Sequence, residues 1–388
     1  MNDDIIRALC PMQDGASYDW AACCEAFPRL HALEATPQNP RYHAEGNVGI
    51  HTRMVLDALL ACDHFQAARG AHREALFLAA LLHDLCKPET TVIDPVTGDI
   101  GQPGHSRRGA VDVRGLLWRA GVPFEQREAV CRLIAVHQVP FFALDSRRGE
   151  SPEFIARRLS WSLDLADLVC LARADMRGRL CVDQQARLDD IALFEQLARE
   201  DGCWGMPRPA ASAHTRLMYA RGAAVHLDTP LFQPPGSPVT VLCGLPASGK
   251  DSWVARRGRG LDVVSFDDAK AELGLKHGEN DGLAAHRAVD KAKVLLRRRE
   301  PFIWNATHLS EQMRNKTLDL LYAYDADVRL VYLEVPSDTL FRRNARRDTT
   351  LKQKDLERML HRWEVPLPWE AHEVVYQVDQ VGLGRLGE

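Results

Sequence analysis

The chain has 388 residues, of which 46% are hydrophobic and 26% are charged, and its formal net charge is −4. The length predicts two domains, and the composition is typical of globular domains and excludes a disordered or uniformly basic chain. Any contact with a polyanion is therefore expected at local arginine clusters, such as those within 297–299 and 342–347.

The cysteines give no sign of a disulfide framework. There are ten, and none of them forms a C-x-x-C pair. The first residues, MNDDIIRALCPMQDG, lack the pattern of a secretory signal, so we expect reduced thiols in a cytoplasmic protein. No apolar run approaches the ~20 residues of a membrane-spanning helix, so no membrane partner is expected.

The hydrophobic rhythm changes once along the chain. Apolar residues first recur at helical spacing, as in HTRMVLDALLAC and REALFLAALLHDL, which predicts an all-α domain over 1–205. A linker rich in Pro, Gly and Ser is expected over 206–236. Short β-rich runs then alternate with helical stretches, which predicts an α/β domain with a parallel sheet over 237–388. The expected strands are 239–243, 261–266, 301–307 and 327–335.

Histidines and aspartates of the first half are spaced as in a metal site. The run LLHDLCK places His83 and Asp84 at the end of an apolar helix, where both can leave the core and converge on one ion. His51 opens an amphipathic helix upstream, and Asp175 ends another apolar helix downstream. Each residue alone is an ordinary polar or surface residue, but their order and spacing together predict a divalent-metal site.

This half resembles the HD phosphohydrolases, most closely the HD domain of bacterial CCA-adding tRNA nucleotidyltransferases, which shows GIHT, a CHDLGK-like run, a following GH and ADxRGR. The resemblance implies a catalytic metal centre that includes Asp84 and holds one or two ions (Mn²⁺, Co²⁺, Ni²⁺ or Mg²⁺). Such an ion polarises phosphoryl oxygens and makes hydroxide available from water. Further candidates implied are His105 and His137, as ligands of a second ion or as phosphate contacts, and Lys87 and Arg179 as phosphate cations. No such role is expected for His43, His72 and His214.

The segment GLPASGK fits the first part of a phosphate-binding loop. It follows an expected strand and opens an expected helix, so its backbone N–H groups and the helix dipole can hold phosphates while Lys250 reaches the terminal ones. A Gly-rich turn that matches by chance is the alternative. The expected nucleotide contacts are Gly244, Ser248, Gly249, Lys250, Asp251 and Ser252.

Asp251 stands where the loop pattern calls for Ser or Thr. A carboxylate is also a ligand for hard cations, so we expect Asp251 to support Mg²⁺, with Ser252 as a second candidate. Downstream, SFDDAK follows the second expected strand. Asp267 is placed to accept a proton from an attacking hydroxyl, and Lys270 to hold a phosphate. The alternative is that Asp267 or Asp268 caps a helix.

The fourth expected strand is followed by FRRNARRD. On a helix, Arg343, Arg346 and Arg347 share a face that could close over a nucleotide and stabilise the transferring phosphoryl group. A solvated arginine-rich helix is the commoner outcome of such a run.

Together these stretches resemble the phage-type 5′-OH polynucleotide kinases. The resemblance implies ATP or another NTP with Mg²⁺, Asp267 as general base, and Arg343 and Arg347 on a lid. It also implies substrate contacts from Lys270, which replaces the arginine of that family, and from Thr307 and His308, which stand at its DTN element.

An HD domain followed by such a kinase resembles the bacterial RNA end-healing enzymes called HD-Pnk. That resemblance implies a metal-dependent 2′,3′-cyclic phosphodiesterase and 2′(3′)-phosphatase joined to an NTP-dependent 5′-OH kinase. The expected partners are RNA ends, with DNA ends as an alternative, and a functional link to an RNA ligase; a homodimer is left open. Two rivals remain: a nucleotide phosphohydrolase fused to a nucleoside or metabolite kinase, and a non-enzymatic NTP sensor with a structural HD core.

Overall fold

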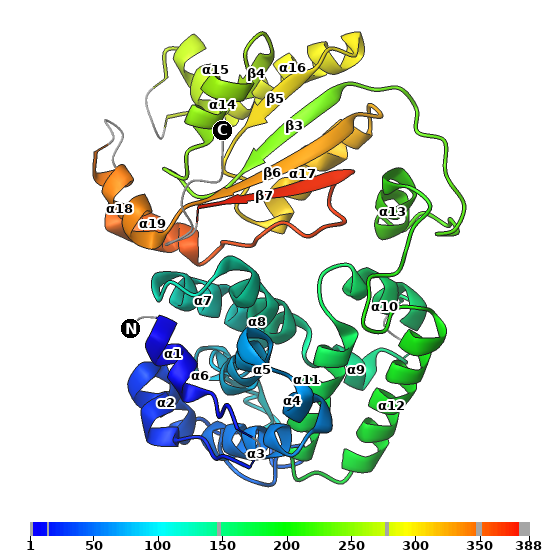
Figure 1. Cartoon of the computed structure of the whole chain (residues 1–388). Coiled ribbons are helices and arrows are strands. Elements are labelled where there is room, and N and C mark those ends of the chain that lie inside the picture. Colours follow the sequence, from blue (N-terminus) through cyan, green and yellow to red (C-terminus); the bar gives the residue numbers. More distant parts are fainter. Residues whose placement is uncertain (1–2, 14, 146–148, 276–278, 347–350, 380–388) are drawn as a thin grey trace. The chain divides into compact units, whose positions relative to one another are not determined.

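The computed structural model describes residues 3–13, 15–145, 149–275, 279–346 and 351–379 of the chain. The chain divides into two compact units, Met1–Arg208 and Pro209–Glu388, each with its own hydrophobic core (Figure 1). Within these described ranges, no helix combines the length and apolar character needed to cross a bilayer.

The first unit is helical, as predicted, apart from a hairpin of two-residue strands. Its elements are α1 (Asp3–Leu9), α2 (Trp20–Ala26), the 3-10 helix η1 (Pro28–Ala35), α3 (Val48–Leu60), α4 (Asp63–Ala67), α5 (Gly70–Leu82), α6 (Lys87–Thr90), β1 (Val92–Ile93), β2 (Ile100–Gly101), α7 (His105–Arg119), α8 (Phe124–Val136), α9 (Val139–Phe142), α10 (Pro152–Ser160), α11 (Leu165–Arg177) and α12 (Gln184–Glu200).

Helix α5 is the central helix of this unit. Every residue from Arg73 to Leu82 is buried, and the helix contacts α3, α8 and α11. A helix that is apolar on most sides is stable only when other helices surround it. Because α5 ends inside the unit, the two residues that follow Leu82 are also buried, which brings His83 and Asp84 into the interior.

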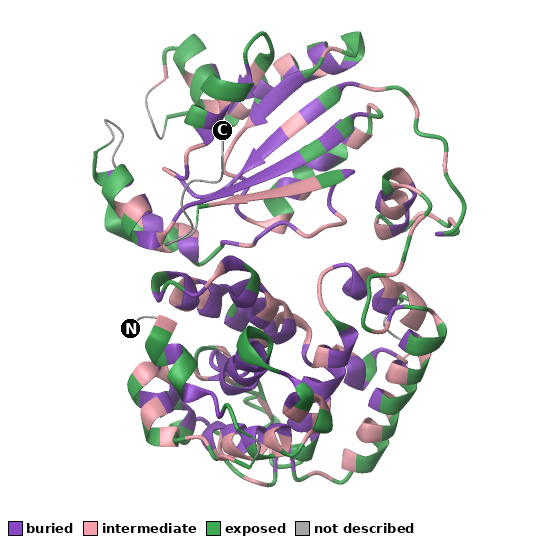
Figure 2. Ribbon diagram, in the orientation of Figure 1, coloured by how far each residue is buried: buried purple, intermediate pink, exposed green. Residues whose placement is uncertain are grey.

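The second unit contains a parallel sheet, as predicted, with the strand order β4-β5-β3-β6-β7. Its elements are α13 (Ala213–Ala220), β3 (Pro238–Cys243), α14 (Lys250–Arg257), β4 (Asp262–Ser265), α15 (Phe266–Glu272), α16 (Asp281–Arg298), β5 (Phe302–Asn305), α17 (Glu311–Tyr322), β6 (Asp327–Glu334), α18 (Ser337–Ala345), α19 (Gln353–Leu360) and β7 (Glu373–Val378). Figure 2 shows the inner strands in the colour of buried residues.

Strand β7 was not expected from the sequence. Its residues, EVVYQV, are exposed or half-buried, as on a sheet edge, and it pairs only with β6 among the described strands. An edge strand lacks the continuous apolar run of a buried parallel strand, so its sequence gives a weak signal. Identifying β7 therefore depends on its pairing with β6, which ends at Glu334, well before β7 begins at Glu373.

The loop after β3 lies at the switch point of the sheet. The chain leaves β3 for β4, returns through β5 and then crosses to β6 on the other side of β3. In open α/β sheets, ligands bind outside the carboxyl ends of the strands at such a point. The ends of β3, β4, β5 and β6 therefore meet where the sequence placed its kinase residues.

Helix α13 lies in the segment 206–236. Its side chains contact His372, just before β7: His214 Nδ1 is 3.1 Å from His372 Nε2, and the two rings stack. Arg216 donates a hydrogen bond to the carbonyl of His372 over 3.0 Å. This helix thus belongs to the second unit and packs beside the start of β7.

Candidate metal centre and phosphate-binding site

Six sequence-predicted ligands of the helical unit come together from the ends or first turns of five helices. They are His51 in α3, His83 and Asp84 after α5, His105 at the start of α7, His137 after α8, and Asp175 near the end of α11. All six are buried, with exposed fractions from 0% to 7%. Because buried polar groups need partners, a group of this size in an interior requires an explanation.

Asp84 is the centre of one part of this cluster. Its Oδ2 lies 3.1 Å from His83 Nε2 and 3.6 Å from His51 Nε2, and its Oδ1 lies 3.4 Å from His105 Nε2. Lys87 Nζ is 2.7 Å from Oδ2. Burial opposes ionisation, but His83 and Lys87 hold the pKa of Asp84 well below its usual value. Asp84 is therefore a carboxylate that can bind a cation.

Asp175 is the centre of the other part. Its Oδ1 lies 3.2 Å from His51 Nε2, and its Oδ2 lies 3.8 Å from His137 Nε2. Arg179 donates hydrogen bonds to both carboxylate oxygens over 2.8 Å. Burial again opposes ionisation, but Arg179 and His51 keep the pKa of Asp175 well below its usual value. In this structure both expected phosphate cations, Lys87 and Arg179, are paired with the ligand carboxylates.

The histidines share one orientation. In each, Nδ1 lies within hydrogen-bonding distance of a backbone carbonyl, which favours a proton on Nδ1 and leaves the Nε2 lone pair directed to the cluster. The pairs are His51 with Gly178 (3.1 Å), His83 with Ala80 (2.8 Å), His105 with Gln102 (2.7 Å) and His137 with Ile134 (2.8 Å). Burial lowers the pKa of His137 to about 3, which keeps this imidazole neutral, as a metal ligand must be.

The cluster has the donor atoms that a divalent cation needs. The Nε2 atoms of His51, His83 and His137 are buried and have no hydrogen-bond partner of good geometry among the described residues. Three overlapping groups of ligand atoms lie within 4.8 Å of one another, and all three contain His83 or His137. Neutral imidazoles and carboxylates are the ligands of first-row transition metals. These groups overlap around two carboxylates, Asp84 and Asp175, which makes the cluster a candidate site for a divalent metal.

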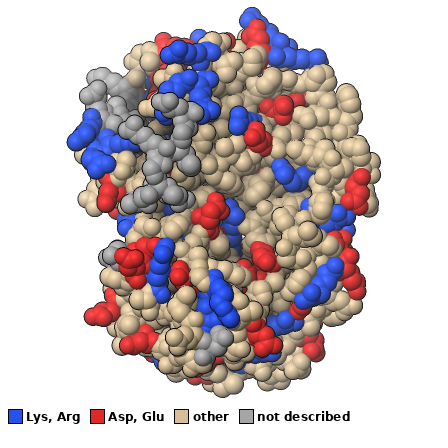
Figure 3. Space-filling model, viewed as in Figure 1, with Lys and Arg blue, Asp and Glu red and all other residues tan. Residues whose placement is uncertain are grey.

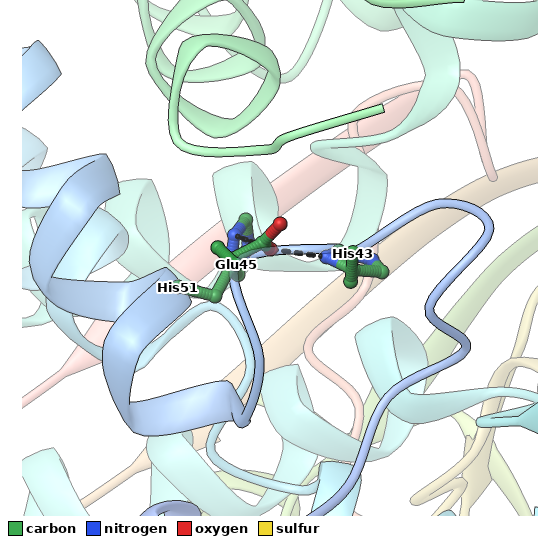
Figure 4. Close-up of side chains that lie close together, drawn as sticks. All are labelled: His43, Glu45 and His51. Atoms are coloured by element: carbon green, nitrogen blue, oxygen red, sulfur yellow. Dashed lines mark hydrogen bonds and ion pairs between the residues drawn. The ribbon is translucent and has the colours of Figure 1, made fainter. Parts of the chain in front are cut away.

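Two further residues reach this cluster without having been expected there. His43, which the sequence gave no role, and Glu45 lie beside His51 (Figure 4). Glu45 Oε1 is 2.7 Å from His43 Nδ1 and 3.2 Å from His51 Nδ1, and its Oε2 accepts a hydrogen bond from Leu180 N. Burial opposes ionisation of Glu45, but its bonds to both histidines lower its pKa strongly. The spacing H-x-E before NVGIHT is the sequence signal that could have suggested them.

The sheet unit contains a cavity of about 620 Å³ at the carboxyl ends of the strands. This volume lies in the range of small-molecule sites. The lining combines the phosphate-loop residues with groups from four strand ends. They are Pro246, Ala247, Ser248, Gly249, Lys250, Asp251, Ser252, Arg256, Asp267, Asn305, Ala306, Thr307, Leu333, Glu334, Arg343, Leu351, Met359, Gln377 and Asp379.

The loop 244–250 has the backbone of a phosphate cradle. Gly244 and Gly249 have φ of 146° and 104°, and a Cβ on Gly244 would stand 2.3 Å from the carbonyl oxygen of Leu333, so only glycine fits there. Lys250 begins α14 and donates hydrogen bonds to the carbonyls of Gly244 and Leu245 over 3.0 and 2.8 Å. Its ammonium group is thus held at the loop, in reach of a phosphate.

Asp251 and Asn305 face the cavity together. Asn305 Nδ2 donates a hydrogen bond to Asp251 Oδ1 over 2.9 Å. Asn305 Oδ1 is buried without a hydrogen-bond partner in the described part of the chain. Two side-chain oxygens beside the loop, one anionic and one neutral, fit the oxygen-rich ligand set of Mg²⁺. Asn305 was not among the expected site residues, because its role depends on β5 lying next to β3.

Asp267 lines the cavity, and neither it nor Asp268 caps the helix. The N-cap of α15 is Ser265, whose hydroxyl accepts a hydrogen bond from Asp268 N over 3.0 Å. The capping alternative is therefore wrong for both aspartates. Since the cap is supplied by a serine, the carboxylate of Asp267 remains available to a ligand in the cavity.

The arginines of the expected lid are only partly on a helix. Arg343 lies on α18, lines the cavity, and has its Nη1 3.5 Å from where a Cβ on Gly249 would stand. Helix α18 ends at Ala345, so Arg346 is its C-cap rather than part of a continuous face. Arg347 lies outside the described residues. On the face in Figure 3, Lys and Arg side chains gather over α14 and α18.

The structure separates the remaining expected substrate contacts. Thr307 lines the cavity, but His308 is buried at 2% exposure, and its two ring nitrogens lie 2.9 Å from Leu242 O and 3.0 Å from Thr317 Oγ1. With both nitrogens engaged, His308 has no free group for a substrate, so its expected contact is wrong for this conformation. Lys270 does not line the cavity, and its Nζ lies 2.6 Å from Asp281.

These two sites define the class of the protein: an HD phosphohydrolase domain followed by a P-loop kinase-type domain. Residues 48–174 match the HD domain family, and residues 239–366 match a family described as AAA domain. An HD domain like that of CCA-adding proteins, followed by a kinase-like P-loop domain, is consistent with the HD-Pnk architecture.

Curated proteins that are similar to this chain include multifunctional CCA proteins. That of Shewanella frigidimarina is 28% identical over 186 residues, which are 46% of this chain and 42% of that protein. That of Laribacter hongkongensis is 33% identical over 175 residues, which are 43% of this chain and 39% of that protein. The chain thus spans less than half of the length of these relatives.

Solved structures with some likeness include a gluconokinase from Sinorhizobium meliloti, which is 19% identical with a TM-score of 0.26 over 37% of this chain and 82% of that one. Kti12 of Chaetomium thermophilum in complex with ADP-AlF3 is 16% identical, with a TM-score of 0.30, over 38% of this chain and 92% of that one. At such TM-scores these structures say nothing about the substrate of this chain.

Proposed function

We propose that the protein heals broken nucleic-acid ends, with a metal-dependent 2′,3′-cyclic phosphodiesterase and 2′(3′)-phosphatase in the helical unit and an NTP-dependent 5′-OH kinase in the sheet unit. The observation that carries this proposal is that Asp267 and Lys250 line one cavity. A carboxylate that can activate a hydroxyl thus faces a phosphate cradle, in a chain whose other domain is of the phosphohydrolase class. A broken RNA needs both reactions, since phosphate is removed at the 3′ side of the break and added at the 5′ side.

In the helical unit, His51, His83, Asp84 and Asp175 are proposed to hold the catalytic ion, with His105 and His137 as ligands of a second ion or as phosphate contacts. A bound divalent cation supplies polarisation of the phosphoryl oxygens and a water of lowered pKa. The protein groups fix the histidine tautomers and exclude bulk water from the buried cluster. Lys87 and Arg179 supply positive charge next to the ligands, where a phosphate ester would add negative charge.

In the sheet unit, Asp267 is proposed to accept the proton of a 5′-hydroxyl. The hydroxyl oxygen attacks the γ-phosphorus of the NTP, and the bond from that phosphorus to the nucleoside diphosphate breaks. Lys250, Arg343 and the loop N–H groups would stabilise the charge on the transferring phosphoryl group. Asp251 and Asn305 are proposed to lie next to Mg²⁺. Arg256 also lines the cavity and could contact a strand phosphate.

The partners follow from these reactions. The proposed substrates are RNA ends, with DNA ends as a second class, and the phosphate donor is ATP or another NTP. Products with a 3′-OH and a 5′-phosphate are those that a ligase joins. A reducing, cytoplasmic setting agrees with the free state of all ten cysteines.

The test uses one RNA that carries a 5′-OH and a 2′,3′-cyclic phosphate, incubated with the full chain, NTP and either Mg²⁺ or Mn²⁺. The proposal expects conversion at both termini, read by mass spectrometry of the intact strand. Exposed His31 offers a neutral control variant, His31→Ala, for both reactions. Phosphorylation of nucleosides or sugars with an untouched RNA 5′ end would instead support the small-molecule kinase rival. NTP binding with no change at either end would support the sensor rival.

A further inference from the structure

A second cluster of metal-ligand residues lies outside the HD centre and has no part in the proposed chemistry. His64 on α4 and His72 on α5 both place Nε2 2.7 Å from Oδ1 of Asp167 on α11. The side chains are 34%, 46% and 15% exposed, respectively, so the group is open to solvent on one side. Two imidazoles from different helices thus meet at a single carboxylate oxygen.

The three side chains, which pair with one another in this structure, are also of the types that bind transition metals. The ligand atoms of the three residues lie within 4.8 Å of one another. Around a tetrahedral ion with bonds of ~2.1 Å, ligand atoms stand about 3.4 Å apart. Rotations of the partly exposed His64 and the exposed His72 side chains would open the observed 2.7 Å separations to that value. Two nitrogens and one oxygen form a three-ligand set with room for water.

Two cysteines are sequence neighbours of the cluster residues. Cys62 precedes α4 and Cys170 lies one helical turn after Asp167 on α11, with their sulfur atoms 3.1 Å apart. Both cysteines are free thiols. Neither sulfur belongs to the described ligand group, so the preference for zinc-class ions over Mg²⁺ or Ca²⁺ comes from its two imidazole nitrogens.

This cluster and the HD centre are separate sites that share two helices. His72 stands in the first turn of α5 and His83 follows its last residue, so they are about 16 Å apart along the axis. Asp167 and Asp175 lie near opposite ends of α11, about 12 Å apart by the same rise per residue. One ion cannot bind at both places, but an ion at the surface would fix α4, α5 and α11 against one another.

We infer that His64, His72 and Asp167 form a surface site for a divalent transition metal of the zinc class, distinct from the HD centre. An ion there clamps the N-terminal ends of the two helices whose other ends carry His83–Asp84 and Asp175. This inference does not rest on the proposed function, since it concerns other residues and a different measurement.

The experiment titrates Zn²⁺ into the full chain against a chromogenic chelator, so that binding is read without any enzyme assay. The double variant His51→Ala/His137→Ala serves as the background, because each ligand group at the HD centre contains one of these two histidines. In this background we expect one remaining Zn²⁺ equivalent, and its affinity should fall at least tenfold in His72→Gln and in Asp167→Asn.

His226→Gln is the matched control, because His226 is 72% exposed and has one carboxylate, Asp228, 3.7 Å away. Its Zn²⁺ binding should equal that of the background. Circular dichroism in EDTA checks folding; should Asp167→Asn not fold, the His64→Gln and His72→Gln variants decide. Equal Zn²⁺ stoichiometry and affinity in the background and in the histidine variants would overturn the inference.

Discussion

Asn305 Nδ2 donates a hydrogen bond to Asp251 Oδ1 over 2.9 Å, which joins the end of β5 to the first turn of α14. Asp251 stands where phosphate loops normally have Ser or Thr, and the bond fixes its carboxylate at the cavity. The residue that departs from the loop pattern, Asp251, is therefore held in place by a side-chain hydrogen bond from Asn305. A hydroxyl and a carboxylate can both bind Mg²⁺, directly or through water.

From this pair we predict that Asp251→Ser keeps kinase activity and that Asn305→Ala loses about tenfold in affinity for Mg·NTP, as for other residues that orient a ligand. Initial rates measured over a range of Mg²⁺ concentrations would show the shift. Ser252→Ala tests the second candidate in parallel. If Asp251→Ser abolishes transfer, the carboxylate performs a step that a hydroxyl cannot.

Replacing the proposed base should silence one reaction alone. We predict that Asp267→Asn lowers phosphorylation of a 5′-OH oligonucleotide by ~10²–10⁴-fold, the usual contribution of a general base, and leaves 3′-end hydrolysis intact. Asp268→Asn is the matched control, because Asp268 is adjacent but does not line the cavity. Transfer of labelled γ-phosphate measures both variants. Full kinase activity in Asp267→Asn would remove this residue from the base role.

The mirror experiment concerns the helical unit. We predict that His83→Ala abolishes hydrolysis of a 2′,3′-cyclic phosphate and leaves the kinase rate unchanged, because the two centres use residues of different units. Gel electrophoresis of the RNA strand measures hydrolysis, because the mobility of the strand changes when its terminal phosphate is opened or removed. Loss of both reactions would show that the units are coupled.

Glu45 should act on the HD centre through His51. Its carboxylate lies 3.2 Å from His51 Nδ1, so we predict that Glu45→Gln lowers Mn²⁺ affinity of the centre by ~10–100-fold, as expected when a ligand histidine loses its orienting partner. Calorimetric Mn²⁺ titration measures this apart from turnover. Glu34→Gln is the control, because Glu34 pairs with Arg53 on the surface. Unchanged Mn²⁺ affinity in Glu45→Gln would assign Glu45 to the fold only.

Acid should weaken the helical unit through Glu128. Burial opposes its ionisation, but Arg114 and Arg127 lower its pKa from 4.5 to about 2. Because the folded pKa is the lower one, the stabilisation is present above pH 4.5 and is lost as pH falls toward 2; it amounts to on the order of 3 kcal/mol. Urea unfolding of the helical unit at pH 5 and pH 3 measures it. Glu128→Gln should flatten this pH dependence, and equal wild-type stability at both pH values would contradict the prediction.

Much of the metal centre followed from local sequence. His83 and Asp84 come directly after an apolar run, and that run is the central helix α5, so its end had to be inside the unit. His43 and Glu45 could not be placed in the same way. They lie in the irregular segment before α3, where no period indicates a direction, and only the contact with His51 shows their place.

The sheet unit shows the same division. The phosphate loop was evident because its glycines, lysine, strand and helix are consecutive in the chain. The residue that contacts the loop, Asn305, was not evident from the sequence, because it reaches Asp251 only through the pairing of β5 with β3. His308 was expected at the substrate, but its ring turns into the core beside Thr317, which no pattern next to it indicates.

The sequence alone determined the two domain classes, the order of the ligand-bearing helices and the position of the phosphate loop, because hydrophobic period and short motifs are local properties. The tertiary structure decided which polar groups meet: Glu45 at His51, Asn305 at Asp251, and His64 with His72 at Asp167. These contacts join residues of different helices and strands, and their distances depend on how the cores pack, which no local pattern encodes.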